Sequence, residues 1–228
     1  MPHEPDVASS LALVAVCHRL ASRGFVAATD GNVSLRLDDG DILVTPSGMN
    51  KGRVSDADLV RVTKDGKRTW GTRPPTTELG MHLFIYAQRP DIRAIVHAHP
   101  VHATAFAAAR LPLTGAVFPE VIIGLGAVPL VPYATPSTDE VRQAIAPVLE
   151  ECDAFLLANH GAVTMGHSLD EALFRMEKVE HAAHTIAVAR ALGGERLLSA
   201  DDLQKLRKVS RKNYGRDLGP LTFLDVEK

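Results

Sequence analysis

The sequence predicts an α/β fold in which a mixed β-sheet is sandwiched between helices. Segments with apolar residues at helical spacing alternate along the chain with shorter segments typical of strands. The early strands are joined by hairpin turns, which make antiparallel pairs and argue against an all-parallel sheet. The 228 residues are 46% hydrophobic and contain no repeat or long linker. We therefore expect a single domain over residues 1–228 with a sizeable core.

The first part of the chain is expected to begin with a helix over residues 7–23, whose apolar stripe ends at Arg23-Gly24. Turns then separate three predicted strands, at residues 33–37, 41–45 and 59–63. Thr76-Thr77-Glu78 opens a second helix, which ends at Arg89-Pro90. The apolar face of this helix would carry Leu79, Leu83 and Tyr86.

The later part of the chain begins with a strand at residues 94–99 and an alanine-rich helix at about 101–110, before an extended, turn-rich region at 112–136. Two Ser-x-x-Glu sequences have the spacing of capping boxes, which mark helix starts. They predict helices from Ser137 to about Glu150 and from Ser168 to Gly193-Gly194. The remaining predicted elements are strands at residues 154–158 and 162–165 and a helix at 201–212.

Charge and composition exclude several functional classes. The net charge is −2 and the basic residues are scattered, so the chain has no electrostatic footprint for nucleic acid. The chain lacks a run of about 18 apolar residues, which a membrane span would need. It also lacks a basic region before an apolar run, which is typical of a signal peptide. Cys17 and Cys152 lie in apolar settings and are expected to be buried free thiols. These observations favour a cytoplasmic protein.

Three histidines follow apolar strands. Strand side chains alternate between faces, so His97 and His99 point the same way and could bind one metal ion. His160 follows a second apolar strand, and the ends of strands far apart in sequence often meet. Each histidine alone could be an ordinary hydrogen-bonded turn residue. Together, three histidines with one open position are the pattern of catalytic zinc.

Glu78 and three turns could complete such a site. Glu78 either complements the helix dipole or removes a proton beside a metal-bound carbonyl, whose enediolate the metal stabilises. The turns expose backbone N–H groups and small polar side chains that suit an anion. Each turn alone could be an ordinary turn or helix cap, and periodicity does not show that they meet. They are Gly31-Asn32, Ser47-Gly48 and Thr76-Thr77.

A rival metal site would use residues four apart on the long helix, the pairs Glu177/His181 and Glu180/His184. Such a site needs further matching helices, which the sequence does not offer. We therefore interpret these pairs as a solvated or ion-paired face. His82, one turn after Glu78, is another candidate ligand, but it lacks a strand-end position.

These motifs, taken in order over nearly the whole chain, resemble the class II aldolase/adducin family, and most closely the short bacterial L-fuculose-phosphate aldolases. No single motif is specific, but the ordered set is. It comprises Gly31-Asn32-Val33-Ser34, Thr45-Pro46-Ser47-Gly48, Thr76-Thr77-Glu78, His97-Ala98-His99, Pro132-Tyr133-Ala134-Thr135, Asn159-His160-Gly161 and Lys212-Asn213-Tyr214-Gly215.

The resemblance implies a three-layer α/β/α fold around a mixed, largely antiparallel sheet, in a homotetramer with active sites at subunit interfaces. It implies zinc, or another divalent ion such as Mn²⁺ or Co²⁺, on His97, His99 and His160. Glu78 would be a ligand in the resting state and the proton-shuttling base during turnover. The phosphate of a phosphorylated sugar would lie against Gly31, Asn32, Ser47, Gly48, Thr76 and Thr77.

The reaction implied is reversible cleavage of a ketose 1-phosphate to dihydroxyacetone phosphate and an aldehyde. One departure concerns the acid that protonates the aldehyde oxygen. The family's aldolases place a tyrosine in the segment that aligns with Ala116–Glu120, where this chain has Phe118. General acid catalysis is commonly worth about 10²–10⁴-fold, so the loss should be felt unless another group, such as Tyr214 or Glu120, replaces it.

The departure leaves several functions open. Besides L-fuculose 1-phosphate, the substrate could be a deoxypentulose or thiomethyl-pentulose phosphate. A decarboxylase of a phosphorylated 3-oxo sugar acid would form the same kind of enediolate by loss of carbon dioxide. A non-catalytic oligomerising module, like the adducin head domains, is disfavoured because the chain keeps all three histidines and Glu78.

Overall fold

Eight strands of the described residues form one sheet, in the order β4-β3-β2-β1-β5-β8-β7-β6. The computed structural model describes residues 4–214, 218 and 224–226. Neighbouring strands are antiparallel except β6 and β7, which are parallel. The predicted mixed, largely antiparallel sheet is therefore confirmed. The strands are β1 (Asn32–Arg36), β2 (Ile42–Val44), β3 (Val60–Val62), β4 (Arg68–Trp70), β5 (Ala94–Ala98), β6 (Leu130–Val131), β7 (Ala154–Leu157) and β8 (Gly161–Gly166).

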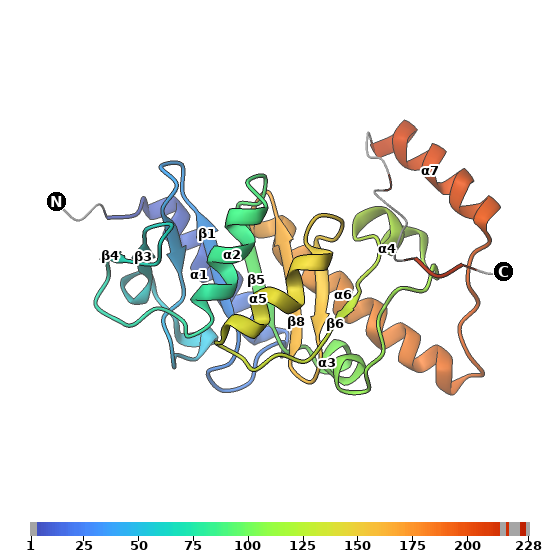
Figure 1. The fold of residues 1–228 in the computed structure, drawn as a ribbon, viewed down its shortest axis with the longest axis horizontal. Helices are drawn as coiled ribbons and strands as arrows, with labels where there is room; N and C mark the ends of the chain where they lie inside the picture. Colours follow the sequence, from blue (N-terminus) through green and yellow to red (C-terminus); the bar gives the residue numbers. More distant parts are fainter. Residues whose placement is uncertain (1–3, 215–217, 219–223, 227–228) are drawn as a thin grey trace.

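Helices cover both faces of the sheet, which makes three layers. Figure 1 shows α2 and α5 in front of the sheet and α1 and α6 behind it. Apolar side chains of α1, α3 and α6 form one buried cluster with the sheet, and those of α2 and α5 form another. The α-helices are α1 (Val7–Ser22), α2 (Leu79–Gln88), α3 (Val101–Ala108), α4 (Pro119–Gly124), α5 (Asp139–Ile145), α6 (Leu169–Ala191) and α7 (Ala200–Tyr214). Short 3₁₀ helices are η1 (Lys51–Arg53), η2 (Asp56–Asp58) and η3 (Ala146–Val148).

One end of the molecule lies away from the sheet. Helices α4 and α7 contact each other there, and Figure 1 shows α7 standing apart from the strands. Their contact forms a small third apolar cluster, which includes Ile122 and Leu203. Helix α4 was not expected, because residues 112–136 were predicted to be extended. Pro119 begins this short helix at a position where its fixed φ and missing N–H are tolerated.

The two predicted capping boxes differ in outcome. At α6 the Ser168 side chain accepts a hydrogen bond from the N–H of Glu171, so the predicted cap is present. At α5 the prediction is wrong, because Thr138 is the N-cap and Ser137 has a φ of +64°. The Glu140 carboxylate there accepts from the N–H of Thr135 instead. Ser137 therefore lies outside the helix, and the N-cap position falls on Thr138.

The buried face of α2 agrees only in part with the predicted one. Tyr86 is buried as predicted, but Leu79 and Leu83 are only partly buried, and Met81, His82 and Ile85 take the central places instead. The predicted face did not include His82, and the observed face is rotated from it by about one residue. The histidine is buried because β1 supplies partners for both ring nitrogens.

Two further predictions can be compared with the fold. Within the described part of the chain, no helix combines the length and apolar character needed to cross a bilayer. Cys17 and Cys152 are buried and free, as predicted. Burial raises the pKa of each thiol to about 12, which keeps both thiols protonated and unreactive at neutral pH.

Candidate metal centre and substrate cavity

The three strand-end histidines lie together at one edge of the sheet. Strands β5 and β8 pair antiparallel with Ala98 opposite Ala162, so the end of β5 lies beside the start of β8. His97 and His99 therefore come next to His160, which stands in the turn before β8. One nitrogen of each ring lies within 4.8 Å of the others, and the Nε2 atoms of His97 and His99 are 3.1 Å apart. Three convergent imidazoles of this kind could hold a divalent metal ion.

Backbone and carboxylate groups orient the histidine rings. His97 is fully buried, and its Nδ1 lies 3.0 Å from the carbonyl oxygen of Ala162. If this nitrogen donates to the carbonyl, Nε2 is left free toward the other two rings. His99 Nδ1 lies 3.6 Å from an oxygen of Asp30. Such outer partners commonly set the tautomer of metal-binding histidines.

Glu78 faces this cluster from the start of α2. It is the N-cap residue of this helix, which agrees with the prediction that Thr76-Thr77-Glu78 opens it. Its Oε2 lies 3.2 Å from His97 Nε2, and its Oε1 lies 3.7 Å from His160 Nε2. Asn32 donates a 2.8 Å hydrogen bond to Oε2. A three-nitrogen, one-carboxylate donor set is therefore assembled from three separate segments.

The charges of this site depend on burial and on close neighbours. Burial alone would raise the pKa of the Glu78 carboxyl, but His97, His160 and the Asn32 hydrogen bond together hold it well below its usual range. Burial and the neighbouring histidines lower the pKa of His99 to about 4 and also lower that of His160. The carboxylate is thus ionised and these two imidazoles are neutral near pH 7, as metal binding requires. Burial opposes the charged form of His97, but the neighbouring Glu78 carboxylate raises its pKa, so a metal ion would have to displace a proton from that ring.

A cavity of about 340 Å³ opens in front of the histidines. Two of the turns that line it are tied together, because Ser47 N–H donates to the Pro74 carbonyl and Thr76 N–H donates to the Thr45 carbonyl. The structure thus brings together every turn residue that the sequence had suggested for an anion. Those lining the cavity are Gly31, Asn32, Ser47, Gly48, Thr76 and Thr77.

Gly31 has to be glycine at this position. Its φ is +72°, and a methyl group on its Cα would lie 2.6 Å from Val26 Cγ1 and 2.8 Å from the His97 carbonyl oxygen. The absence of a side chain lets the turn lie directly against the end of β5. Backbone of the anion-binding turn and the metal-binding strand can therefore share one wall of the cavity.

Lys51 was missed by the sequence reasoning. It lines the same cavity although the residue is only 1% exposed. Its ammonium donates to the carbonyl oxygens of Thr29 (2.9 Å) and Met49 (2.7 Å), and burial lowers its pKa. No local pattern distinguishes this lysine from a surface lysine, because its burial depends on two turns closing over it.

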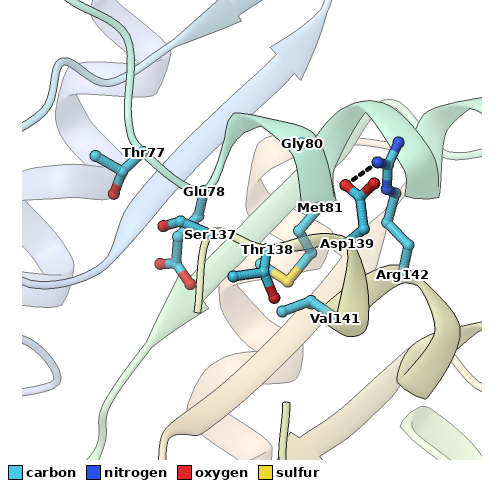
Figure 2. Close-up of a pocket in the computed structure, with 9 residues that line it drawn as sticks. All are labelled: Thr77, Glu78, Gly80, Met81, Ser137, Thr138, Asp139, Val141 and Arg142. Atoms are coloured by element: carbon cyan, nitrogen blue, oxygen red, sulfur yellow. Dashed lines mark hydrogen bonds and ion pairs between the residues drawn. The ribbon is translucent and has the colours of Figure 1, made fainter. Parts of the chain in front are cut away.

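A smaller cavity of about 100 Å³ lies on the other side of Glu78. Figure 2 shows the Glu78 carboxylate next to Ser137, with Thr138 and the Asp139–Arg142 ion pair further along the same wall. Ser137 also lines the larger cavity. The loop before α5 thus borders both hollows, and Glu78 lies between them.

The other candidate ligands are engaged elsewhere. His82 places its ring nitrogens against Asn32 and Ser34, away from the cluster. On α6, Glu177 pairs with Arg19 and Arg23. Among the described residues, the three strand-end histidines form the only group with metal-ligand spacing. The interpretation of the α6 pairs as an ion-paired face is consistent with this arrangement.

On the same helix, Glu180 pairs with His102, and the ring of His102 stacks on His184 at 3.9 Å. Glu180 also accepts hydrogen bonds from the backbone N–H groups of His102 and Ala103 at the start of α3. This carboxylate therefore joins two helices instead of contributing to a metal site.

Of the two aromatic positions discussed for proton transfer, only Phe118 has a described side chain, and it does not line the cavity. Phe118 is the N-cap of α4, and its half-buried ring packs against the main core. Tyr214 is the last residue of α7, and its side chain falls outside the described part of the chain. Its predicted role remains a prediction.

Comparison with known proteins agrees with this geometry. Residues 11–187 match a family model described as Class II Aldolase and Adducin N-terminal domain. The chain is 37% identical over 195 residues to the 3-oxo-tetronate 4-phosphate decarboxylase of Escherichia coli (strain K12), covering 81% of this chain and 88% of the relative. It is 32% identical over 193 residues to the L-fuculose phosphate aldolase of Haemophilus influenzae (strain ATCC 51907 / DSM 11121 / KW20 / Rd), covering 84% and 88%. A solved L-fuculose 1-phosphate aldolase superposes with a TM-score of 0.83 at 29% identity, over 91% of this chain and 98% of that one.

Proposed function

Because the chain belongs to the class II aldolase and adducin family, we propose that it is a metal-dependent carbon–carbon lyase acting on a phosphorylated sugar. One observation carries the proposal. An ionised carboxylate, two of the three clustered histidines and a set of turns suited to an anion border a single cavity, with the third histidine, His97, buried beside them. A purely structural module would have no need for this combination.

His97, His99 and His160 would hold the metal, with Glu78 as a fourth ligand in the resting state. Zinc suits three imidazoles and a carboxylate, as do Mn²⁺ and Co²⁺. When bound, the ion supplies Lewis-acid stabilisation for the negative charge that develops on the substrate oxygens. We propose zinc, or another of these divalent ions, as the metal that the protein uses.

Glu78 is the base of the proposed reaction. Its carboxylate is ionised, lies beside two of the histidines and opens onto the cavity. On leaving the metal, it would take the proton from the substrate carbon or hydroxyl and return it at the end of the cycle. The hydrogen bond from Asn32 holds one carboxylate oxygen during this exchange.

The phosphate end of the substrate would occupy the turn-lined side of the cavity. Backbone N–H groups near Gly31 and Gly48 and the hydroxyls of Ser47, Thr76 and Thr77 suit a phosphate. Lys51 adds a buried positive charge at the base of the same cavity. Burying a cation is unfavourable without nearby negative charge. Asp30, on the same cavity, supplies some, and a bound phosphate would add more.

The leading reaction is reversible cleavage of a ketose 1-phosphate, either L-fuculose 1-phosphate or a deoxypentulose 1-phosphate, to dihydroxyacetone phosphate and an aldehyde. The second candidate is decarboxylation of a phosphorylated 3-oxo sugar acid. Phe118 favours the second candidate, because it offers no hydroxyl for an aldehyde oxygen. Decarboxylation forms the same enediolate without producing an aldehyde.

The two reactions separate in one experiment. The chain is purified without a histidine tag, stripped of metal, and reloaded with Zn²⁺, Mn²⁺ or Co²⁺. We expect either condensation of dihydroxyacetone phosphate with one of a panel of aldehydes, or carbon dioxide release from 3-oxo 4-phosphate sugar acids. Absence of both reactions, in protein that binds metal, would refute the proposed lyase. Protein that cannot be loaded with metal would instead support the non-catalytic module.

A further element of the proposal is assembly into a homotetramer, with the active site completed at a subunit interface. Light scattering coupled to gel filtration measures the mass directly. A monomer with full activity would contradict the need for a neighbouring subunit.

A further inference from the structure

A line of buried polar groups runs from Glu78 into the core between α2 and β1. Asn32 Nδ2 lies 2.8 Å from Glu78 Oε2, and Asn32 Oδ1 lies 2.5 Å from His82 Nε2. His82 Nδ1 lies 2.6 Å from Ser34 Oγ, which lies 2.8 Å from Tyr86 Oη. Asn32, Ser34, His82 and Tyr86 are all buried. Glu78 is therefore the point where this buried line reaches the cavity.

The chemistry of these groups fixes the direction of the hydrogen bonds from Glu78 to Ser34. An ionised carboxylate only accepts, so the NH₂ group of Asn32 faces Glu78 and its carbonyl oxygen faces His82. That oxygen cannot donate, so His82 Nε2 carries a proton. A neutral imidazole has one N–H, so Nδ1 accepts from the Ser34 hydroxyl. The Tyr86 hydroxyl can then donate to Ser34 or to the Arg93 carbonyl. Complete burial, which lowers the pKa of His82 to about 3, agrees with a neutral ring.

We propose that His82 is a positioning residue, whose Nε2–H holds the Asn32 amide in the orientation that presents its N–H to Glu78. The proposal deepens the proposed function, on which its catalytic consequence rests. Without the histidine, the amide could turn and direct its carbonyl oxygen at the carboxylate. Glu78 would then lose its hydrogen bond and face a repulsive dipole.

Asn32 makes this orientation important because it joins three parts of the site. Its backbone pairs with His97 across β1 and β5, its side chain bonds Glu78, and it lines the anion-binding side of the cavity. A change in its rotamer would therefore displace the carboxylate relative to the histidines. His82 controls this residue from inside the core, without contacting the substrate or the metal.

The first test reads the tautomer directly. Metal-free protein labelled with ¹⁵N-histidine is measured by NMR, and the His82 signals are assigned by their absence in His82→Gln. We expect a neutral ring protonated at Nε2 near pH 7. A ring protonated at Nδ1, or a cationic ring, would overturn the proposal.

The second test uses variants and cobalt binding, measured by the absorption of bound Co²⁺. Loss of an outer partner of a metal site typically weakens metal affinity or activity about 10–100-fold. We expect at least about a tenfold loss in His82→Leu, which fills the space but cannot donate. In His82→Gln, whose amide offers a donor and an acceptor side by side, we expect recovery of most of the affinity. Equal losses in the two variants would show a merely structural role and overturn the proposal.

Two further variants guard against misfolding and distinguish the two proposals. Ser34→Ala removes only the hydroxyl behind His82, and a smaller loss of cobalt affinity is expected. His18→Leu is the matched control, because His18 also bonds one ring nitrogen, to the Val54 carbonyl, but lies outside the site. Unchanged cobalt affinity in folded Ser34→Ala and His82→Leu would overturn the positioning role even if lyase activity is found. Weakened affinity without any lyase activity would support it while refuting the proposed function.

Discussion

Replacing Lys51 with methionine tests whether the buried cation serves the substrate. The variant keeps the aliphatic stem and removes an ammonium that donates to two backbone carbonyls. Each carbonyl left without a partner costs about 1–3 kcal/mol, whereas removing a buried charge saves a desolvation penalty of several kcal/mol. These opposing effects leave the free energy of unfolding changed by no more than about 2 kcal/mol.

Phosphate binding should change much more than stability. A hydrogen bond to a charged group is worth about 1.5–3 kcal/mol, which corresponds to about a 10- to 150-fold change in Kd. Isothermal titration with inorganic phosphate and with dihydroxyacetone phosphate measures this effect, and thermal unfolding confirms the fold. The matched control is Lys178→Met, because Lys178 also donates to a backbone carbonyl, that of Glu120, but lies outside the cavity. A folded Lys51→Met protein that binds phosphate as tightly as wild type would refute the reasoning.

Three further predictions concern the base, the glycine turn and the buried histidines. Glu78→Gln keeps the shape of the side chain but not its charge, so kcat should fall about 10²–10⁴-fold. Elemental analysis should still find bound metal in this variant. An unchanged kcat would rule out Glu78 as the base. Gly31→Ala places a side chain at a φ of +72° and in contact with two atoms under 3 Å away. The control is Gly24→Ala, because Gly24 has a φ of +69° but open space around it, so only about 1–2 kcal/mol of left-handed strain is expected there. Gly31→Ala should lose more stability than this control. Equal losses in denaturant unfolding would contradict the steric argument. His99 and His82 have pKa values of about 4 and about 3 when folded, against 6.5 when unfolded, so below pH 6.5 the unfolded state of the metal-free protein binds more protons. These two residues should therefore make the free energy of unfolding rise with pH between about 4 and 6.5. If that free energy did not change with pH in either wild type or His82→Leu, the neutral burial of the two histidines would be contradicted.

The sequence predicted the layers of the fold because they depend on local periodicity. Helices α1, α3 and α6 and most strands lie where apolar spacing placed them. The failures came where neighbours in space override the local pattern. Strand β4 was missed because it is short and only partly buried, and the face of α2 was misjudged because β1 supplies hydrogen-bond partners to His82.

By itself, the sequence determined the chemical groups of the candidate site. Strand alternation and strand-end position singled out His97 and His99, and the same reasoning found His160. Only the tertiary structure decided how these groups meet. Asn32 and Glu78 are 46 residues apart in the chain, yet they share a hydrogen bond, and Lys51 is buried only because two turns close over it. Hydrogen bonds between distant segments depend on the pairing and packing of the sheet, which no local pattern of residue types contains.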